Sequence, residues 1–289
     1  MLDEKMMKKS SLDKISTVLE RYDIKARKAL SQNFIFDLNL TERIVQSMGD
    51  IDNHDVLEIG PGPGSLTRSL LSLGARKVIA IEKDKRFIKP IEEISVSYPG
   101  RLRIINDDIL SIKPEFFLNP PVKIVSNLPY NIGTQILLKF INSETWPPFW
   151  DSLTLMFQKE VAERIISKSN TKSYGRLSII SQWRSNIDYL FTVSSKSFTP
   201  TPAIDSAVLK FTPRSQPFFI TNKKKLELVV KKAFSQRRKM LRQSLRLENI
   251  DIQKLLATIN INPTCRPEEL TIKQFCMLAN AIDAYSTAN

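Results

Sequence analysis

The chain has 289 residues, of which 42% are hydrophobic and 25% are charged, and this composition predicts a globular fold with a sizeable core. Lysine and arginine outnumber aspartate and glutamate by 13, which favours a polyanionic partner. One histidine and two cysteines exclude a zinc ligand set and a disulfide framework, and a catalytic triad would have to use His54, to which we assign no role. We therefore expect no metal site and a reducing, cytoplasmic location.

The first 14 residues are polar and charged, and they lack the apolar run of a secretory signal. Apolar runs elsewhere, such as 78–81 and 153–157, are too short to span a bilayer, so we expect no membrane contact. Residues 1–27 are expected to form a frayed N-terminal extension.

Five short, apolar and mostly β-branched segments alternate with helical segments in the next part of the chain. The expected strands are 56–59, 77–81, 102–105, 122–125 and 153–157, with helices that include 66–73 and 85–95. This alternation predicts βαβ units and a parallel sheet that is covered on both faces. Two later segments, 187–193 and 206–211, are too close for a helical crossover, and we expect them to pair antiparallel at one end of the sheet.

The composition changes after Pro213, where the strand pattern stops and apolar residues recur at helical spacing. The predicted helical stripe consists of Leu226, Val229, Val230, Ala233, Phe234, Leu241 and Leu245. From residue 213 on, 14 lysines and arginines stand against 6 aspartates and glutamates. The sequence therefore predicts an α/β domain over residues 28–212 and a small, basic, all-α domain over residues 213–289.

A glycine-rich loop follows the first expected strand, in the segment Glu58-Ile59-Gly60-Pro61-Gly62-Pro63-Gly64. Its three glycines allow a tight strand-to-helix turn at which the backbone can approach a ligand closely. The spacing is neither the dinucleotide fingerprint nor a phosphate-binding P-loop. It resembles the first motif of S-adenosylmethionine-dependent methyltransferases, in which the loop lies against the methionine and ribose parts of the cofactor. The resemblance implies a Rossmann-like methyltransferase domain.

Two acids follow the next two expected strands. Glu82 comes 22 residues after Gly60, where its carboxylate can accept two hydrogen bonds from a ribose diol. Asp108 follows the third strand, where its carboxylate can reach an adenine amino group. The loop and the two acids at successive strand ends predict one nucleoside site.

The segment Asn127-Leu128-Pro129-Tyr130 follows the fourth strand and resembles the signature of methyltransferases that act on exocyclic base nitrogens. Because the N6 lone pair of adenine is delocalised into the ring, that nitrogen is a poor nucleophile. Hydrogen bonds accepted from N6–H by Asn127 and by the carbonyl of Leu128 or Pro129 would free the lone pair, and the proline holds its φ fixed. Tyr130 would stack on an extruded base. No strong general base is needed, because the methylated nitrogen loses its proton to water.

From about Lys28 on, the chain resembles the ribosomal RNA adenine N6,N6-dimethyltransferases, a family that includes the erythromycin-resistance methylases of large-subunit RNA. The segment Ser31-Gln32-Asn33-Phe34-Ile35 resembles the element that lies over the cofactor, which implies cofactor contacts from Gln32, Asn33 and Ile35. The segment Phe198-Thr199-Pro200-Thr201-Pro202 resembles the loop whose phenylalanine stacks on the target base opposite the tyrosine. Ile35 and Ser31 replace the more usual leucine and glycine, and both changes are mild in size.

Three further segments resemble family signatures: Tyr174-Gly175-Arg176-Leu177-Ser178, Phe234-Ser235-Gln236-Arg237-Arg238-Lys239 and Arg266-Pro267-Glu268-Glu269-Leu270. The last of them and the basic tail resemble the housekeeping small-subunit enzymes, which dimethylate two adjacent adenosines in a hairpin loop near the 3′ end of small-subunit (16S) rRNA. The resemblance implies S-adenosyl-L-methionine as cofactor, small-subunit rRNA or a small-subunit precursor as partner, a role in ribosome biogenesis, and a monomer.

Basic residues recur along the expected C-terminal helix, opposite its apolar stripe. The candidates for contact with RNA phosphates are Lys231, Arg237, Arg238, Lys239 and Arg242. Two alternatives stay open: an adenine methylase of large-subunit rRNA or of DNA, and an RNA-binding ribosome-assembly factor for which methylation is secondary. Mapping the modified nucleotide separates the first, and an inactive variant that still supports subunit maturation would favour the second.

Overall fold

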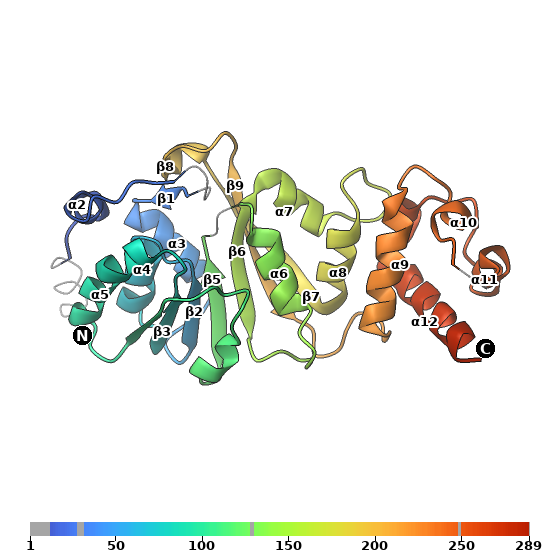
Figure 1. The fold of residues 1–289 in the computed structure, drawn as a ribbon, viewed down its shortest axis with the longest axis horizontal. Helices are drawn as coiled ribbons and strands as arrows, with labels where there is room; N and C mark the ends of the chain where they lie inside the picture. Colours follow the sequence, from blue (N-terminus) through green and yellow to red (C-terminus); the bar gives the residue numbers. More distant parts are fainter. Residues whose placement is uncertain (1–11, 28–31, 128–129, 248–249, 289) are drawn as a thin grey trace. The chain divides into compact units, whose positions relative to one another are not determined.

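A computed structural model describes residues 12–27, 32–127, 130–247 and 250–288. The chain forms two compact units: the first contains Met1–Lys159 and Asp188–Pro213, and the second contains Glu160–Ile187 and Arg214–Asn289 (Figure 1). The division after Pro213 falls where the composition changes, and Glu160–Ile187, which the sequence assigns to the α/β domain, groups with the C-terminal helices.

A seven-stranded sheet forms the centre of the first unit, with the strand order β4-β3-β2-β5-β6-β9-β7. Its strands are β2 (Asp55–Ile59), β3 (Lys77–Ile81), β4 (Leu102–Ile105), β5 (Val122–Ser126), β6 (Ser152–Gln158), β7 (Ser185–Val193) and β9 (Ser206–Pro213). All neighbouring pairs from β4 to β6 are parallel, and β9 runs antiparallel to β6. The five expected parallel strands are confirmed, and so is the place of the two late strands at one end of the sheet.

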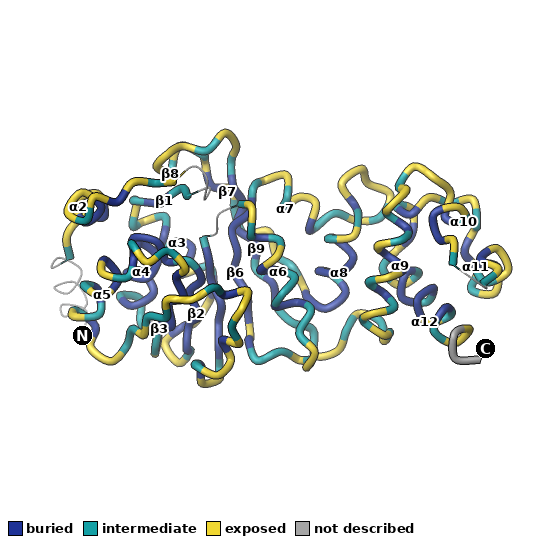
Figure 2. Tube along the Cα trace, in the orientation of Figure 1, coloured by how far each residue is buried: buried dark blue, intermediate teal, exposed yellow. Residues whose placement is uncertain are grey.

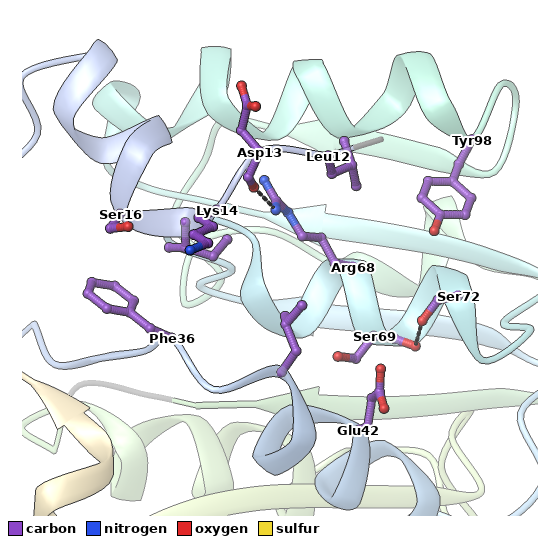
Figure 3. A pocket seen from close by; sticks show the side chains of 12 residues that line it. Leu12, Asp13, Lys14, Ser16, Phe36, Glu42, Arg68, Ser69, Ser72 and Tyr98 are labelled. Atoms are coloured by element: carbon purple, nitrogen blue, oxygen red, sulfur yellow. Dashed lines mark hydrogen bonds between the residues drawn. The ribbon is translucent and has the colours of Figure 1, made fainter. Parts of the chain in front are cut away.

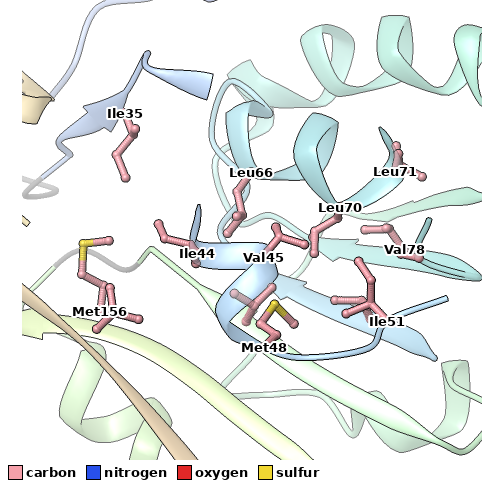
Figure 4. Packing of buried hydrophobic residues seen from close by; sticks show 14 of the residues in the cluster. Ile35, Ile44, Val45, Met48, Ile51, Leu66, Leu70, Leu71, Val78 and Met156 are labelled. Carbon is pink, nitrogen blue, oxygen red and sulfur yellow. The ribbon is translucent and has the colours of Figure 1, made fainter. Parts of the chain in front are cut away.

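The two faces of the sheet are both buried, which explains the nearly continuous apolar strands. Val56, Val78 and Val125 belong to one hydrophobic cluster with side chains of the helices on their face (Figure 4). The alternate residues Leu57 and Ile79 point to the opposite face and are equally buried. The helices of the first unit are α2 (Ile15–Arg21), α3 (Leu38–Ser47), α4 (Ser65–Ser72), α5 (Ile88–Ser97) and α6 (Gly133–Ile141).

The expectation of a frayed N-terminal extension is wrong for residues 12–27. Helix α2 buries Ile15 and Leu19 in a cluster with Phe34, Phe87 and Ile91 (Figure 2). Those partners are distant in the sequence, so the apolar face of a seven-residue helix gives little signal by itself.

The second unit is mainly helical in the part of it that the structure describes. Its helices are α7 (Lys159–Ile166, from its second residue on), α8 (Arg176–Arg184), α9 (Lys223–Ser235), α10 (Leu241–Ser244), α11 (Ile252–Thr258) and α12 (Ile272–Ala288). The fold class predicted from the sequence, a Rossmann-like α/β domain with a helical C-terminal part, is confirmed.

The single helical stripe expected from Leu226 to Leu245 is interrupted. Helix α9 ends at Ser235, and its apolar stripe from Leu226 to Ala233 is buried. The backbone amide of Leu241 donates to the carbonyl oxygen of Cys265 (2.7 Å) and that of Arg242 donates to the carbonyl oxygen of Pro263 (3.2 Å), where a continuous helix would use the preceding turn. Arg237, Arg238 and Lys239 therefore lie in the connection between two helices and not on a helix face.

No helix among the described residues is long and apolar enough to cross a membrane. The described ranges also contain no group of three or more His, Cys, Asp or Glu side chains that could hold a metal ion.

Candidate cofactor and substrate site

A cavity of about 710 Å³ lies at the carboxyl ends of the parallel strands of the first unit, which is where open α/β sheets bind ligands. Nine of the ten residues predicted to bind a cofactor line it: Gln32, Asn33, Ile35, Glu58, Gly60, Gly62, Glu82, Asp108 and Asn127. Residues from the segment before α3 and from the ends of four strands therefore meet at one place. We call this space the cofactor cavity.

The glycine loop makes the turn from β2 into α4 with three left-handed residues, since Gly60, Gly62 and Gly64 have φ values of 65°, 54° and 87°. A Cβ at Gly60 would have no atom within 4 Å, so the space beside this residue is open. A Cβ at Gly64 would collide with Cδ1 of Ile94, and Gly64 does not line the cavity. Gly64, predicted to contact the cofactor, is thus explained by helix packing.

Glu58 is 1% exposed, and its carboxylate lies beneath the glycine loop. Thr67 Oγ1 donates to Glu58 Oε2 at 2.6 Å, while Oε1 has no hydrogen-bond partner among the described residues. Burial raises the pKa of Glu58 to about 8. A buried carboxyl group with a free oxygen suits a cavity that receives a cationic ligand.

Glu82 is the second buried carboxyl group of the cavity, at 7% exposure. Its Oε2 accepts from the amide of Gly62 at 3.0 Å, and its Oε1 accepts from the amide of Asp84 at 2.7 Å. Burial raises its pKa, and the two backbone donors oppose that effect. Each oxygen keeps a second lone pair, so the carboxylate still has acceptor capacity for a hydroxyl pair.

Asp108 is held by two donors at the rim of the cavity. Lys83 Nζ donates to its Oδ2 at 2.8 Å, and the amide of Leu110 donates to its Oδ1 at 2.9 Å. The hydrogen bond from Lys83 is the largest cause of a lowered pKa for Asp108, so this carboxylate is ionised at neutral pH.

Gln32 belongs to a polar network that the sequence gave no reason to expect. Its Oε1 accepts from the amide of Arg27 (3.0 Å) and from Arg86 (3.2 Å), and its Nε2 donates to Asp84 Oδ2 (3.1 Å). Arg86 also lowers the pKa of Asp84 by a side-chain hydrogen bond. The network fastens the segment before β1 to the end of β3, and the charged run directly after Glu82 was its only sequence signal.

A small sheet joins the cofactor segment to the loop that carries Phe198. Strand β1 (Phe34–Ile35) pairs antiparallel with β8 (Phe198–Thr199), and Ile35 lies opposite Phe198. The amide nitrogen of Asn33, in its favoured orientation, donates to the carbonyl oxygen of Pro200 at 2.9 Å. Phe198 is 3% exposed and packs in the core cluster, so its ring does not line the cofactor cavity.

The other candidate base-binding residues lie where β5 ends. Ser126 Oγ donates to the carbonyl oxygen of Ile59, which ties the end of β5 to the end of β2 and holds Asn127 beside the glycine loop. Tyr130 is half-buried, its hydroxyl is 2.7 Å from Ser206 Oγ, and burial raises its pKa. Leu128 and Pro129 lie outside the described residues.

Sequence reasoning missed much of the cavity wall. Asn131, Ile132 and Gln135, at the start of α6, line it, and their place directly after the Asn127-to-Tyr130 motif was a usable signal. Phe34 and Phe87 also line it, with ring centroids 5.5 Å apart. Their sequence separation left no signal.

In the second unit, the three remaining signatures meet, and we call them together the motif cluster: Tyr174–Ser178, Phe234–Lys239 and Arg266–Leu270. The rings of Tyr174 and Phe234 lie 6.4 Å apart. Arg237 Nε lies 3.8 Å from Glu268 Oε2, and Arg237 also donates to the carbonyl oxygen of Thr171 at 3.3 Å. Among the five candidates for RNA contact, Lys231, Arg238 and Lys239 are exposed, while Arg237 and Arg242 are half-buried.

Residues 23–284 match the family model described as ribosomal RNA adenine dimethylase. A protein named ribosomal RNA small subunit methyltransferase A from Paracoccus denitrificans is 48% identical over 273 residues, which cover 94% of this chain and 97% of the relative. The protein of the same name from Ruegeria sp. (strain TM1040) is 47% identical over 273 residues, with 94% and 98% covered.

Two solved structures share the fold over most of the chain. A dimethyladenosine transferase from Plasmodium falciparum has a TM-score of 0.75 at 24% identity, covering 88% of this chain and 98% of its own. The 23S rRNA methyltransferase ErmE has a TM-score of 0.64 at 25% identity, covering 87% and 100%.

Proposed function

The chain belongs to the ribosomal RNA adenine dimethylase family, and from that premise we propose that it dimethylates N6 of two adjacent adenosines in the 3′-terminal hairpin loop of small-subunit rRNA. Membership of the family confirms the predicted activity, an rRNA adenine methyltransferase that uses S-adenosyl-L-methionine. The observation that carries the proposal is the convergence of Glu58, Glu82 and Asn127 on one cavity.

The residues of the cofactor cavity fit S-adenosylmethionine. The free Oε1 of Glu58 can accept from the ammonium group, and Glu82 has lone pairs left for the ribose diol. Asp108, ionised and at the rim, can accept from the adenine amino group. When bound, the cofactor supplies an electrophilic methyl group on a sulfonium. Gln32, Asn33 and Ile35 cover the cavity from the β1 side, and Gly60 and Gly62 bring the backbone close to it.

The acceptor base is held by the residues that follow β5. Asn127 accepts a hydrogen bond from N6–H with its side-chain oxygen, and a carbonyl of Leu128 or Pro129 accepts the other. These two acceptors orient the nitrogen lone pair toward the cavity. Tyr130 provides a stacking face, with its hydroxyl anchored on Ser206. Phe198 provides the second face once its ring leaves the core.

The rRNA is contacted through phosphates by Lys231, Arg237, Arg238, Lys239 and Arg242. The assignment of residues 28–212 to methyl transfer, of 213–289 to RNA binding and of 1–27 to an extension is part of this proposal. So are action on a small-subunit precursor as a monomer, without metal or membrane, and a cytoplasmic location.

The test is mass spectrometry of rRNA after incubation of undermethylated small subunits with the protein and S-adenosylmethionine. Paired N6,N6-dimethyladenosines in the 3′-terminal hairpin are expected. An unmodified hairpin, with the cofactor shown to bind, would overturn the substrate assignment. Methyl groups gained on large-subunit rRNA or on DNA would establish the corresponding adenine methylase. Rescue of subunit maturation by an inactive variant would establish the assembly role.

A further inference from the structure

A second cavity, of about 330 Å³, lies in the first unit between α2, α3 and α4 (Figure 3). It shares no lining residue with the cofactor cavity. Its volume is at the lower end of the range typical of small-molecule sites. We call it the Arg68 cavity, after the residue that decides its chemistry.

Arg68 projects from α4 into this cavity and is 8% exposed (Figure 3). Its Nη1 donates to the backbone carbonyl of Asp13, and its Nε has no hydrogen-bond partner. No carboxylate of the described residues lies within 4.0 Å of the guanidinium. Burial lowers the pKa of Arg68, as expected for a cation without a close counter-charge.

The nearest acids already serve another arginine. Asp13 pairs with Arg21, and Glu93 accepts from Arg21 at 3.1 Å and from the Tyr22 hydroxyl at 2.6 Å. Arg21 therefore takes the carboxylates that would otherwise neutralise Arg68. An arginine cannot shed its proton, and a buried, unpaired charge is destabilising, so the arrangement leaves one negative charge to be supplied in the cavity.

The walls define which anion fits. Ile15, Phe36 and Leu38 give one side of the cavity an apolar surface, and Ser16 and Ser72 add hydroxyl groups. Glu42 also lines it, which disfavours a doubly charged ligand such as a phosphate dianion. We propose that the Arg68 cavity binds a small organic monocarboxylate, with the carboxylate on the Arg68 guanidinium and a compact apolar body against Phe36.

The experiment titrates the full-length protein with benzoate in low-salt buffer, with neutral benzamide as the isosteric control. Saturable binding of benzoate and none of benzamide is expected, by calorimetry and by thermal unfolding. At ten times the dissociation constant the midpoint should rise by about 3 °C. Absence of saturable benzoate binding, or equal binding of benzamide, would overturn the proposal.

Variants separate the site from general effects. Arg68→Gln should weaken benzoate binding at least tenfold, and Ser16→Phe, at the exposed rim of the cavity, should do the same by filling it. Arg103→Gln, an exposed arginine outside the cavity, should bind as the wild type does. All three should bind S-adenosylmethionine normally, which reports that the fold is intact. Undiminished benzoate binding by both cavity variants would contradict the assignment.

One further outcome identifies an internal occupant. If the wild type binds no benzoate but the double variant Asp3→Asn, Glu4→Gln does, an acidic side chain of the chain's own first residues supplies the charge. The proposal of an external ligand would then be wrong.

Discussion

The cofactor cavity of the first unit is built from residues that directly follow parallel strands, whereas the motif cluster of the second unit is built from loops and helix ends. In the first, the ladder fixes each strand end, so Glu58, Glu82 and Asn127 are placed by backbone hydrogen bonds. In the second, the position of Arg237 depends on Glu268 and Thr171. Side-chain changes should therefore alter chemistry in the cavity, and positioning in the cluster.

The largest effect is expected from Asn127→Ala. Loss of the acceptor for N6–H should lower the single-turnover rate of methyl transfer by about 10² to 10³-fold, comparable to the loss of one oriented hydrogen bond at a reacting centre. RNA affinity and thermal stability should change little, because the side chain carries no core packing. Asn39→Ala, on an exposed turn of α3, is the matched control. Wild-type turnover by Asn127→Ala would refute its role.

Glu58 should break the rule that cavity residues leave stability unchanged. Its folded pKa of about 8 exceeds the model value of 4.5, so the folded state binds more protons between those values. The free energy of unfolding should fall as pH rises from 6 to 8, by at most about 2.7 kcal/mol. Glu58→Gln should remove that fall and weaken cofactor binding. Urea unfolding at both pH values measures it, and an unchanged pH dependence would contradict it.

Two glycines of one loop should respond differently to alanine. Gly64→Ala combines a φ of 87° with a collision against Ile94, and should cost about 2 kcal/mol of stability. Gly60→Ala meets no atom within 4 Å and should cost about 1 kcal/mol from its φ alone. Cofactor affinity should show the reverse order, because only Gly60 lines the cavity. Equal losses of stability would mean that packing does not distinguish them.

The smallest effect is expected in the motif cluster. The half-exposed Arg237–Glu268 pair should show a coupling of about 0.5 kcal/mol in a double-mutant cycle of unfolding. Arg237→Ala should also reduce the salt dependence of rRNA binding by about one phosphate contact, and Glu268→Gln should leave it unchanged. An unchanged salt dependence in Arg237→Ala would make this arginine a structural residue only.

The strand ends were predictable because parallel strands bring their carboxyl ends to one edge, so Glu58, Glu82 and Asp108 could be grouped from spacing alone. The interruption after Ser235 was not, because the carbonyl oxygens that accept from Leu241 and Arg242 come from Cys265 and Pro263. The burial of Phe198 depends on its pairing with Ile35, over 160 residues away. Local pattern carries no information on such partners.

The pairing of β1 with β8 has a consequence for the order of events during turnover. Two transfers to one adenosine consume two cofactor molecules, and Phe34 and Ile35 line the cavity in which both are used. Opening the cavity on this side breaks the pairs to Thr199 and Phe198, on the loop assigned to the base. Exchange of the cofactor and release of the base are then one event. The reaction should be distributive, with free monomethylated rRNA accumulating before the dimethylated product.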